Sequence, residues 1–264
     1  MPNSNLVDIG VNLTHSRFSD DRSAVIERAH TAGVSRLILT GVTLAESQSA
    51  ADLASRYPGQ MHSTAGVHPH HASDWNDHNA EKLSALLKHP CVSAVGETGL
   101  DYHRDFSPRI SQQQAFKAQL ALAAKSGLPV FCHERDAADD FIAIIQQYRQ
   151  SLTNAVVHCF TGDRRIFDAS LALDLYLGVT GWICDERRGS ALRAVIAEIP
   201  LERLMIETDA PFLLPRDLPN PPSDRRNEPS YLPHILATIA SLRAESIDTL
   251  AAATQANSAR FFRF

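Results

Sequence analysis

Four residues of the kinds that bind metals and move protons each stand at the end of a short apolar run. They are Glu97, His133, His158 and Asp209, separated by 36, 25 and 51 positions. Two imidazoles and two carboxylates form a mixed nitrogen and oxygen donor set that suits Mg²⁺, Mn²⁺ or Zn²⁺. A divalent ion held by such a set activates water, so this pattern indicates metal-assisted hydrolysis.

Glu97 lies in the stretch 92–101, an apolar run that ends in a glycine-rich turn. A carboxylate at the end of a buried strand is unfavourable unless a partner compensates its charge. Gly96 and Gly99 carry no side chain, and we expect them to let a ligand or ion approach the backbone beside Glu97.

Further polar residues occupy similar positions. Asn12 and His68 each end an apolar run, and both are candidates for binding substrate. The proline-rich segment 211–229 follows soon after Asp209 and contains Arg225 and Arg226. Long structured loops often bind substrate, and arginine pairs bidentately with phosphate oxygens. This loop therefore predicts a phosphate-bearing substrate beside the metal.

The elements that must position these residues alternate along the chain. Eight apolar or β-branched runs predict strands at 6–12, 36–41, 63–68, 92–101, 128–133, 155–160, 175–179 and 204–209. Helical spacing occurs at 23–33, 44–54, 79–88, 111–126, 136–148, 189–199, 232–242 and 247–261. This alternation is typical of a parallel sheet covered by helices. Eight strands favour a closed TIM barrel, (β/α)8, over a doubly wound sheet.

The length of 264 residues fits one such barrel, which typically needs about 250 residues. We therefore expect a single domain over residues 1–264. In a barrel the carboxyl ends of all strands meet at one face, where barrel enzymes carry their catalytic residues. The residues at the predicted strand ends would then share one pocket.

Composition narrows the function classes further. The chain is 44% hydrophobic and 21% charged, which is ordinary for a soluble globular protein. No apolar run approaches the ~20 residues that span a bilayer, and the polar start 1–5 is not a signal peptide. We expect a cytoplasmic monomer without a membrane segment. The net charge of −5 attracts no nucleic acid globally, so local arginines or bound cations would have to hold a polyanion.

The four cysteines are expected to be free thiols. They are Cys91, Cys132, Cys159 and Cys184, and no two of them have CxxC spacing. Two adjoin histidines in apolar runs, where buried reduced thiols are the usual case. The spacing therefore favours neither disulfides nor a zinc site.

Four motifs resemble those of the TatD family of metal-dependent hydrolases. They are GVHPH at 66–70, GETGLD at 96–101, HCFTG at 158–162 and IETDAP at 206–211. The likeness runs from Asp8 to the last predicted helix. It implies a TIM-barrel deoxyribonuclease of the cytoplasm that uses Mg²⁺ and acts as a 3′-to-5′ exonuclease on single-stranded DNA and RNA, with a part in the repair of oxidative DNA damage. It also implies that the metal ligands are Glu97, His133, His158 and Asp209, with Glu97 at the position that bridges two metals.

The chain departs from the family in the first strand. Most members carry the pattern Asp-x-His-x-His there, whereas Asp8 is followed by Gly10 and Asn12 in the histidine positions. Glycine has no ligand atom in its side chain, and asparagine offers only a neutral oxygen. One site of a two-metal mechanism therefore lacks its strongest ligands. A carboxylate with waters and phosphate oxygens still suits Mg²⁺, with Mn²⁺ or Zn²⁺ as other candidates.

The expected reaction is phosphodiester hydrolysis at a metal held by Glu97 and the two histidines. Asp209 orients the water and accepts its proton, or completes the metal shell. Arg225 and Arg226 stabilise the developing negative charge. A recessed pocket admits a strand end more readily than a duplex. Two alternatives stay open: hydrolysis of amides or esters, as in related barrels, and a non-catalytic accessory role in protein export.

Overall fold

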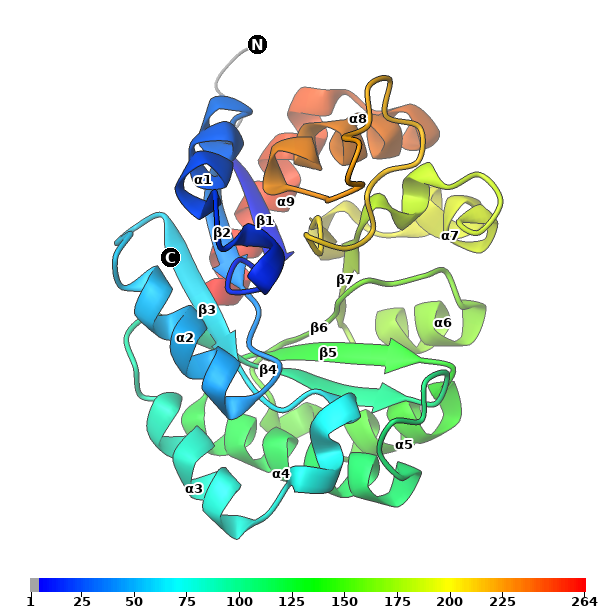
Figure 1. Ribbon diagram of the computed structural model, residues 1–264. Coiled ribbons are helices and arrows are strands. Elements are labelled where there is room, and N and C mark those ends of the chain that lie inside the picture. The colour runs from blue at the N-terminus through cyan, green and yellow to red at the C-terminus, as the bar shows by residue number, and fades with distance from the viewer. Residues whose placement is uncertain (1–4) are drawn as a thin grey trace. The chain divides into compact units, whose positions relative to one another are not determined.

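The computed structural model describes residues 5–264, and Figure 1 shows its helices and strands. All eight strands belong to one sheet and follow one another in chain order from β1 to β8. Their bounds are β1 Leu6–Val11, β2 Val34–Leu39, β3 Met61–Ala65, β4 Val92–Asp101, β5 Val130–Arg135, β6 Ala155–Val157, β7 Tyr176–Val179 and β8 Leu204–Ile206. This strand order with intervening helices is the topology of a (β/α)8 barrel, as the sequence predicted.

Nine α-helices occur among the described residues. They are α1 Arg22–Thr31, α2 Leu44–Ala54, α3 Asp77–Leu86, α4 Arg109–Ser126, α5 Ala138–Tyr148, α6 Arg164–Ala172, α7 Ser190–Val195, α8 Leu232–Arg243 and α9 Ile247–Phe262. Helix α6 has no counterpart among the predicted helices. Within residues 5–264, every helix is too short or too polar to be a membrane span.

Several strands end earlier than the sequence predicted. Strand β3 stops at Ala65, β6 at Val157 and β8 at Ile206, so His68, His158 and Asp209 lie in the turns that follow. After β6 and β8 the backbone leaves the extended conformation, because Cys159 and Asp209 adopt positive φ values of 48° and 55°. His68 keeps an extended backbone and caps a short 3-10 turn. These three side chains are therefore carried by loops that begin where the strands stop.

The contacts of the chain divide it into two compact units. Unit 1 comprises 1–39, 159–167 and 177–264, of which residues from 5 onward are described, and unit 2 comprises 40–158 and 168–176. In unit 2, β3 pairs with β4, β4 with β5 and β5 with β6, all in parallel. In unit 1, β1 pairs with β2 and β7 with β8, also in parallel, and an isolated parallel bridge joins Val11 to Ala210 beyond β8.

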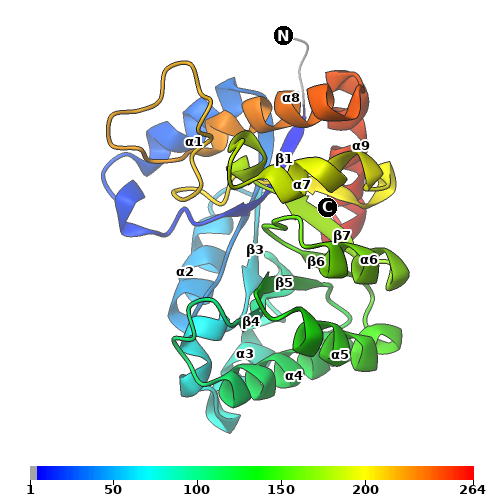
Figure 2. The ribbon, with the colours of Figure 1, turned by 90° about the vertical axis from the view of Figure 1, so that its right-hand side faces the viewer.

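The core of unit 2 lies between its strands and the helices α4 and α5. Figures 1 and 2 show both helices on the same side of β4 and β5. Phe116 of α4 and Phe141 of α5 stack with ring centroids 5.4 Å apart, and both are buried. This packing supports β4 and β5, the strands that carry Glu97 and His133.

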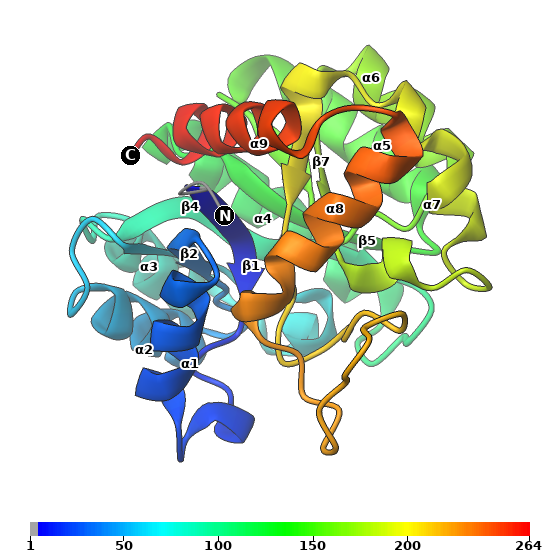
Figure 3. The same cartoon turned by 90° about the horizontal axis from the view of Figure 1, so that it is seen from above.

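In unit 1, α8 and α9 lie beside β1, as Figure 3 shows from above. Asp8 of β1 is fully buried, and its carboxylate accepts hydrogen bonds from Thr208 N (2.9 Å) and Thr208 Oγ1 (2.5 Å). Burial raises the pKa of Asp8 to about 7, although the bonds from Thr208 act in the opposite direction. These bonds tie β1 to the segment that carries Asp209.

Candidate metal centre

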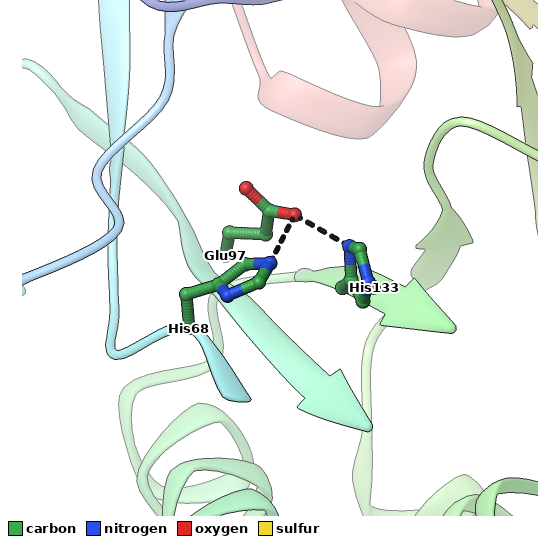
Figure 4. Close-up of side chains that lie close together, drawn as sticks. All are labelled: His68, Glu97 and His133. Atoms are coloured by element: carbon green, nitrogen blue, oxygen red, sulfur yellow. Dashed lines mark hydrogen bonds and ion pairs between the residues drawn. The ribbon is translucent and has the colours of Figure 1, made fainter. Parts of the chain in front are cut away.

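Three imidazoles surround one carboxylate oxygen of Glu97 in unit 2. Glu97 Oε1 lies 2.8 Å from His158 Nε2, 2.9 Å from His133 Nδ1 and 3.3 Å from His68 Nε2. Figure 4 shows the rings of His68 and His133 turned toward this oxygen. Glu97, His68 and His158 are buried, and His133 is partly exposed. Three of the four predicted ligands thus lie together, with His68 beside them.

Backbone hydrogen bonds between neighbouring segments bring these residues together. Gly99 of β4 is the register partner of His133 in β5, so Glu97 and His133 belong to adjacent strands. The N–H of His158 donates to Cys132 O (2.9 Å), which places His158 beside β5. The N–H of His68 donates to Val42 O at the same distance. The fold therefore positions the cluster through its main chain, which is the rigid way to build a site.

Gly96 and Gly99 serve a different purpose from the one we predicted. A Cβ on Gly96 would lie 2.2 Å from Phe131 O, and a Cβ on Gly99 would lie 1.9 Å from His133 O. Both glycines also have positive φ values, 142° and 148°. They therefore let strand β5, rather than a ligand or ion, approach the backbone of β4.

The charges of the cluster depend on one another. Burial acts to raise the pKa of Glu97, but the imidazoles of His158, His68 and His133 outweigh it and hold that pKa well below its usual range. Burial acts to lower the pKa of His133, but the carboxylates of Asp101 and Glu97 outweigh it and raise that pKa. The imidazoles around Glu97 thus stabilise its charged form, and the carboxylates around His133 stabilise the charged form of that ring.

His68 is held in one tautomer as a neutral ring. Its Nδ1 accepts a hydrogen bond from His70 N (3.1 Å), which leaves the ring proton on Nε2, the atom that faces Glu97. Burial lowers the pKa of His68 to about 4, so the ring carries no charge at neutral pH. His68 is thus built to donate a hydrogen bond to an oxygen, whereas a metal ligand needs a free lone pair at that nitrogen.

Asp101 was not among the predicted site residues, yet it lies at the edge of this cluster. Its Oδ2 is 2.8 Å from His70 Nε2 and 3.3 Å from His133 Nε2. The signal was present in the sequence, because residues 97 and 101 of one strand point to the same face. A carboxylate behind a ligating histidine fixes the orientation of the ring.

The donor atoms suit a divalent metal. His68, Glu97 and His133 each present a nitrogen or oxygen to a common space, with all three atoms within 4.8 Å of one another. His133 Nε2 is buried and makes no hydrogen bond, although Asp101 is near. An unsatisfied buried nitrogen is unfavourable, and a metal on Nδ1 would leave Nε2 to donate to Asp101. Because His68 is fixed as a hydrogen-bond donor, Glu97, His133 and His158 are the residues that could hold a metal.

Asp209 and Asn12, which the sequence also indicated, lie in unit 1. Asn12 Nδ2 donates to Asp209 Oδ1 (3.1 Å) and its backbone N–H donates to Ala210 O (2.8 Å). The N–H of Asp209 donates to Gly10 O (2.9 Å). The amide of Asn12 is thus engaged in orienting the Asp209 carboxylate.

The two candidate arginines differ in their surroundings. Arg226 donates to both carboxylate oxygens of Asp21 (2.8 and 2.7 Å) and to Glu228 Oε1 (2.7 Å), and Arg28 joins the same two carboxylates. The hydrogen bond from Arg226 is the main cause that lowers the pKa of Asp21 to about 2. Arg225 is exposed on the loop, with a positive φ of 54°. Arg226 therefore ties the loop to the start of α1, whereas Arg225 faces solvent.

A cavity of about 940 Å³ opens elsewhere in unit 2, between α2 and α3. Its walls include Gln48, His71, Lys82 and Lys88. His68, Glu97 and His133 do not line it. The cavity is therefore separate from the candidate metal centre.

The chain resembles known proteins in both sequence and fold. Residues 7–263 match the family of TatD related DNases. The chain is 52% identical over 258 residues to the 3′-5′ ssDNA/RNA exonuclease TatD of Pectobacterium atrosepticum, covering 98% of this chain and 99% of that protein. The crystal structure of a TatD homolog from Escherichia coli K12 superposes with a TM-score of 0.91 at 29% identity, covering 99% of each chain. An uncharacterised TIM-barrel protein from Bordetella bronchiseptica shares the fold alone, with a TM-score of 0.58 at 13% identity over 94% of this chain and 83% of that one.

Proposed function

The chain belongs to the family of TatD related DNases, and we propose that it removes nucleotides from the 3′ ends of single-stranded DNA and RNA with the help of a divalent metal. The observation that carries the chemistry is the convergence of His133 and His158 on one oxygen of Glu97. The substrate class and the direction of digestion rest on the 52% identical relative that bears this activity in its name.

In this proposal Glu97, His133 and His158 hold the metal. A bound divalent cation would polarise the scissile phosphate and lower the pKa of a water toward neutrality. We propose Mg²⁺ as the working ion, because Gly10 and Asn12 leave room for waters and phosphate oxygens where most of the family has histidines. Imidazole nitrogens also accept Mn²⁺ and Zn²⁺, so the assay below compares all three.

The other residues bind substrate and move the proton. Asp209, oriented by Asn12, accepts the proton of the attacking water. His68 donates its Nε2 proton to a phosphate oxygen, a role that its neutral tautomer supports. Arg225 is exposed and stabilises the negative charge of the phosphate. Arg226 contributes by holding the loop in place, because its guanidinium is already bound to Asp21 and Glu228.

Phe106 offers a surface for the terminal base. Its side chain is 68% exposed, an unusual state for a large apolar ring, and its centroid lies 4.7 Å from that of His70. His70 in turn contacts Asp101 at the edge of the metal centre. Stacking of a base on an aromatic ring contributes about 1–3 kcal/mol of binding free energy, whichever base it is. Such a platform suits an enzyme that must accept every base in turn.

The family resemblance supports the remaining parts of the proposal. We propose that the whole chain acts as one catalytic domain, as a monomer, in the cytoplasm. Trimming of oxidatively damaged 3′ ends in DNA repair is the role that the resemblance implies.

A labelled oligonucleotide tests the proposed function. Chelator-treated protein is incubated with a 5′-labelled single strand and Mg²⁺, Mn²⁺ or Zn²⁺, beside a blunt duplex and a chromogenic ester. We expect a ladder that shortens from the 3′ end of the single strand with Mg²⁺ or Mn²⁺, and none with EDTA or with Glu97→Gln. Glu81→Gln, at an exposed site on α3, is the matched control. Digestion that persists in EDTA, or ester cleavage without nucleotide release, would contradict the proposal.

A further inference from the structure

A second group of metal-binding side chains lies in unit 1, outside the centre described above. It consists of Cys184, Asp217 and His234, here called the Cys–Asp–His cluster. Their sulfur, oxygen and nitrogen atoms all lie within 4.8 Å of one another. His234 Nε2 is 2.6 Å from Asp217 Oδ1. The three residues are far apart in the chain, so the fold alone brings them together.

Each residue of the cluster comes from a different segment. Cys184 ends the short 3-10 turn Gly181–Cys184 after β7, Asp217 lies in the loop between β8 and α8, and His234 lies in the first turn of α8. The loop is the one that carries Arg225. A metal ion bound by all three residues would therefore anchor this loop at Asp217.

The donor set selects for a particular class of metal. A thiolate, an imidazole and a carboxylate together suit Zn²⁺, whereas Mg²⁺ and Ca²⁺ avoid sulfur. Zinc binds sulfur at about 2.3 Å and nitrogen or oxygen at about 2.0–2.1 Å, which places N and O ligands roughly 3.3 Å apart. Asp217 and His234, now 2.6 Å apart, must separate slightly to meet these distances, and all three donor atoms already lie within 4.8 Å of one another.

The exposure of the cluster also fits metal binding. Cys184 is buried, while the side chains of Asp217 and His234 are 46% and 28% exposed, so an ion can enter from solvent. Cys184 Sγ contacts Thr238 Oγ1 at 3.5 Å, and Thr238 donates to His234 O (3.1 Å). Thr238 thus touches two of the three ligand residues and supports their arrangement.

A catalytic role for the thiol is disfavoured. Burial raises the pKa of Cys184 to about 12, so it is a poor nucleophile at neutral pH. Without a metal, the cluster is a hydrogen-bonded His–Asp pair beside a protonated thiol.

We propose that Cys184, Asp217 and His234 form a zinc site that anchors the loop between β8 and α8. Zn²⁺ displaces the proton of the Cys184 thiol, which leaves to solvent, and the three side chains become its ligands, with a water in the fourth position. The three residues of this site belong to unit 1, whereas Glu97, His133 and His158 belong to unit 2. The inference therefore stands or falls separately from the proposed nuclease activity.

Cobalt spectroscopy on the full-length protein tests the proposal directly. Chelator-treated protein is titrated with Co²⁺, which replaces zinc and gives a near-ultraviolet charge-transfer band only when a thiolate binds it. We expect this band in the wild-type protein, its loss on addition of Zn²⁺, and its absence in Cys184→Ser. Cys91→Ser, which removes a partly buried free thiol of unit 2, is the matched control and should keep the band.

Further variants keep the test decisive. Asp217→Asn changes a side chain that is about half exposed and should not disturb folding. We expect it to keep the band but to weaken Co²⁺ binding at least tenfold. Zinc should raise the thermal unfolding temperature of the wild type and of Cys91→Ser further than that of Cys184→Ser, in which only the Glu97 centre remains to bind it. The proposal is overturned if the wild type shows no thiolate band, or if Cys184→Ser keeps it. It is equally overturned if Cys159→Ser removes the band, because the thiol would then belong to another place in the chain.

Discussion

Replacing Asp101 with Asn tests whether the carboxylate behind His133 helps to build the metal centre. Asp101 Oδ2 lies 2.8 Å from His70 Nε2 and 3.3 Å from His133 Nε2, while its Oδ1 accepts a hydrogen bond from Arg104 N. Asparagine keeps an acceptor for Arg104, so the turn should persist. It removes the negative charge that acts on the two rings. The change is therefore confined to the orientation and protonation of the histidines.

Two effects of this substitution oppose each other, and pH separates them. Loss of a carboxylate that orients a metal-binding histidine typically weakens metal binding 10–100-fold, or about 1.4–2.8 kcal/mol. Asp101 also helps to raise the pKa of His133, and a protonated ring must lose its proton before it binds metal. In the wild type, metal affinity should therefore rise as pH increases through that raised pKa. In Asp101→Asn this proton competition weakens, so the defect should be large at about pH 8 and smaller at about pH 6.

Calorimetric titration of the metal-free protein with Mn²⁺ at both pH values measures these affinities. Exonuclease rates as a function of Mn²⁺ provide a second readout, and saturating metal should recover most of the rate. Asp136→Asn is the matched control, because Asp136 pairs with His103 at 2.9 Å in the same unit but both side chains are exposed. Equal metal affinity of Asp101→Asn and wild type at about pH 8 would refute the reasoning, as would an equal loss in Asp136→Asn.

Three other predictions concern Glu97, the two candidate arginines of the loop and Asp8. Glu97→Gln should lower kcat/KM for a single-stranded oligonucleotide by about 100-fold or more, since it alters a metal ligand itself rather than a residue that orients a ligand. Glu81→Gln should match wild type, and equal kcat/KM values for Glu97→Gln and wild type would contradict the role of Glu97. Arg226→Ala should lower the free energy of unfolding by about 1–3 kcal/mol, because it removes one of the two arginines shared by Asp21 and Glu228 and leaves only Arg28. Arg225→Ala should change the free energy of unfolding by no more than about 0.5 kcal/mol and should raise KM; urea unfolding and steady-state kinetics would reveal the reverse pattern. The pKa of Asp8 is about 7 in the folded chain and near 3.8 in the unfolded chain, so between these pH values only the folded state holds the proton. The free energy of unfolding should therefore fall by roughly 3 kcal/mol from about pH 5 to about pH 8. In Asp8→Asn this part of the fall should disappear from urea unfolding curves, and an unchanged pH profile would contradict the raised pKa.

The sequence by itself determined the fold class, and it identified Glu97 together with the two histidines nearest to its oxygen Oε1. Parallel strands end at a common edge, so residues at strand ends separated by about one strand–helix unit must approach one another. Glu97, His133 and His158 met this condition, and they lie together in unit 2. The motifs around them also indicated the family, because several short patterns in the right order seldom coincide by chance.

Other features depended on contacts between separate segments of the chain, which local sequence patterns do not reveal. The roles of Gly96 and Gly99 were misread, because the need for glycine came from the backbone of a neighbouring strand. Nothing in the sequence around Arg226 indicated that it pairs with Asp21, which lies more than two hundred residues earlier. The sequence likewise indicated no metal role for Cys184, because such motifs are recognised by close spacing. Its partners Asp217 and His234 lie on segments that only the tertiary structure brings within ligand distance. Side-chain chemistry at the strand ends was therefore readable from the sequence, whereas the partners of each side chain were decided by packing.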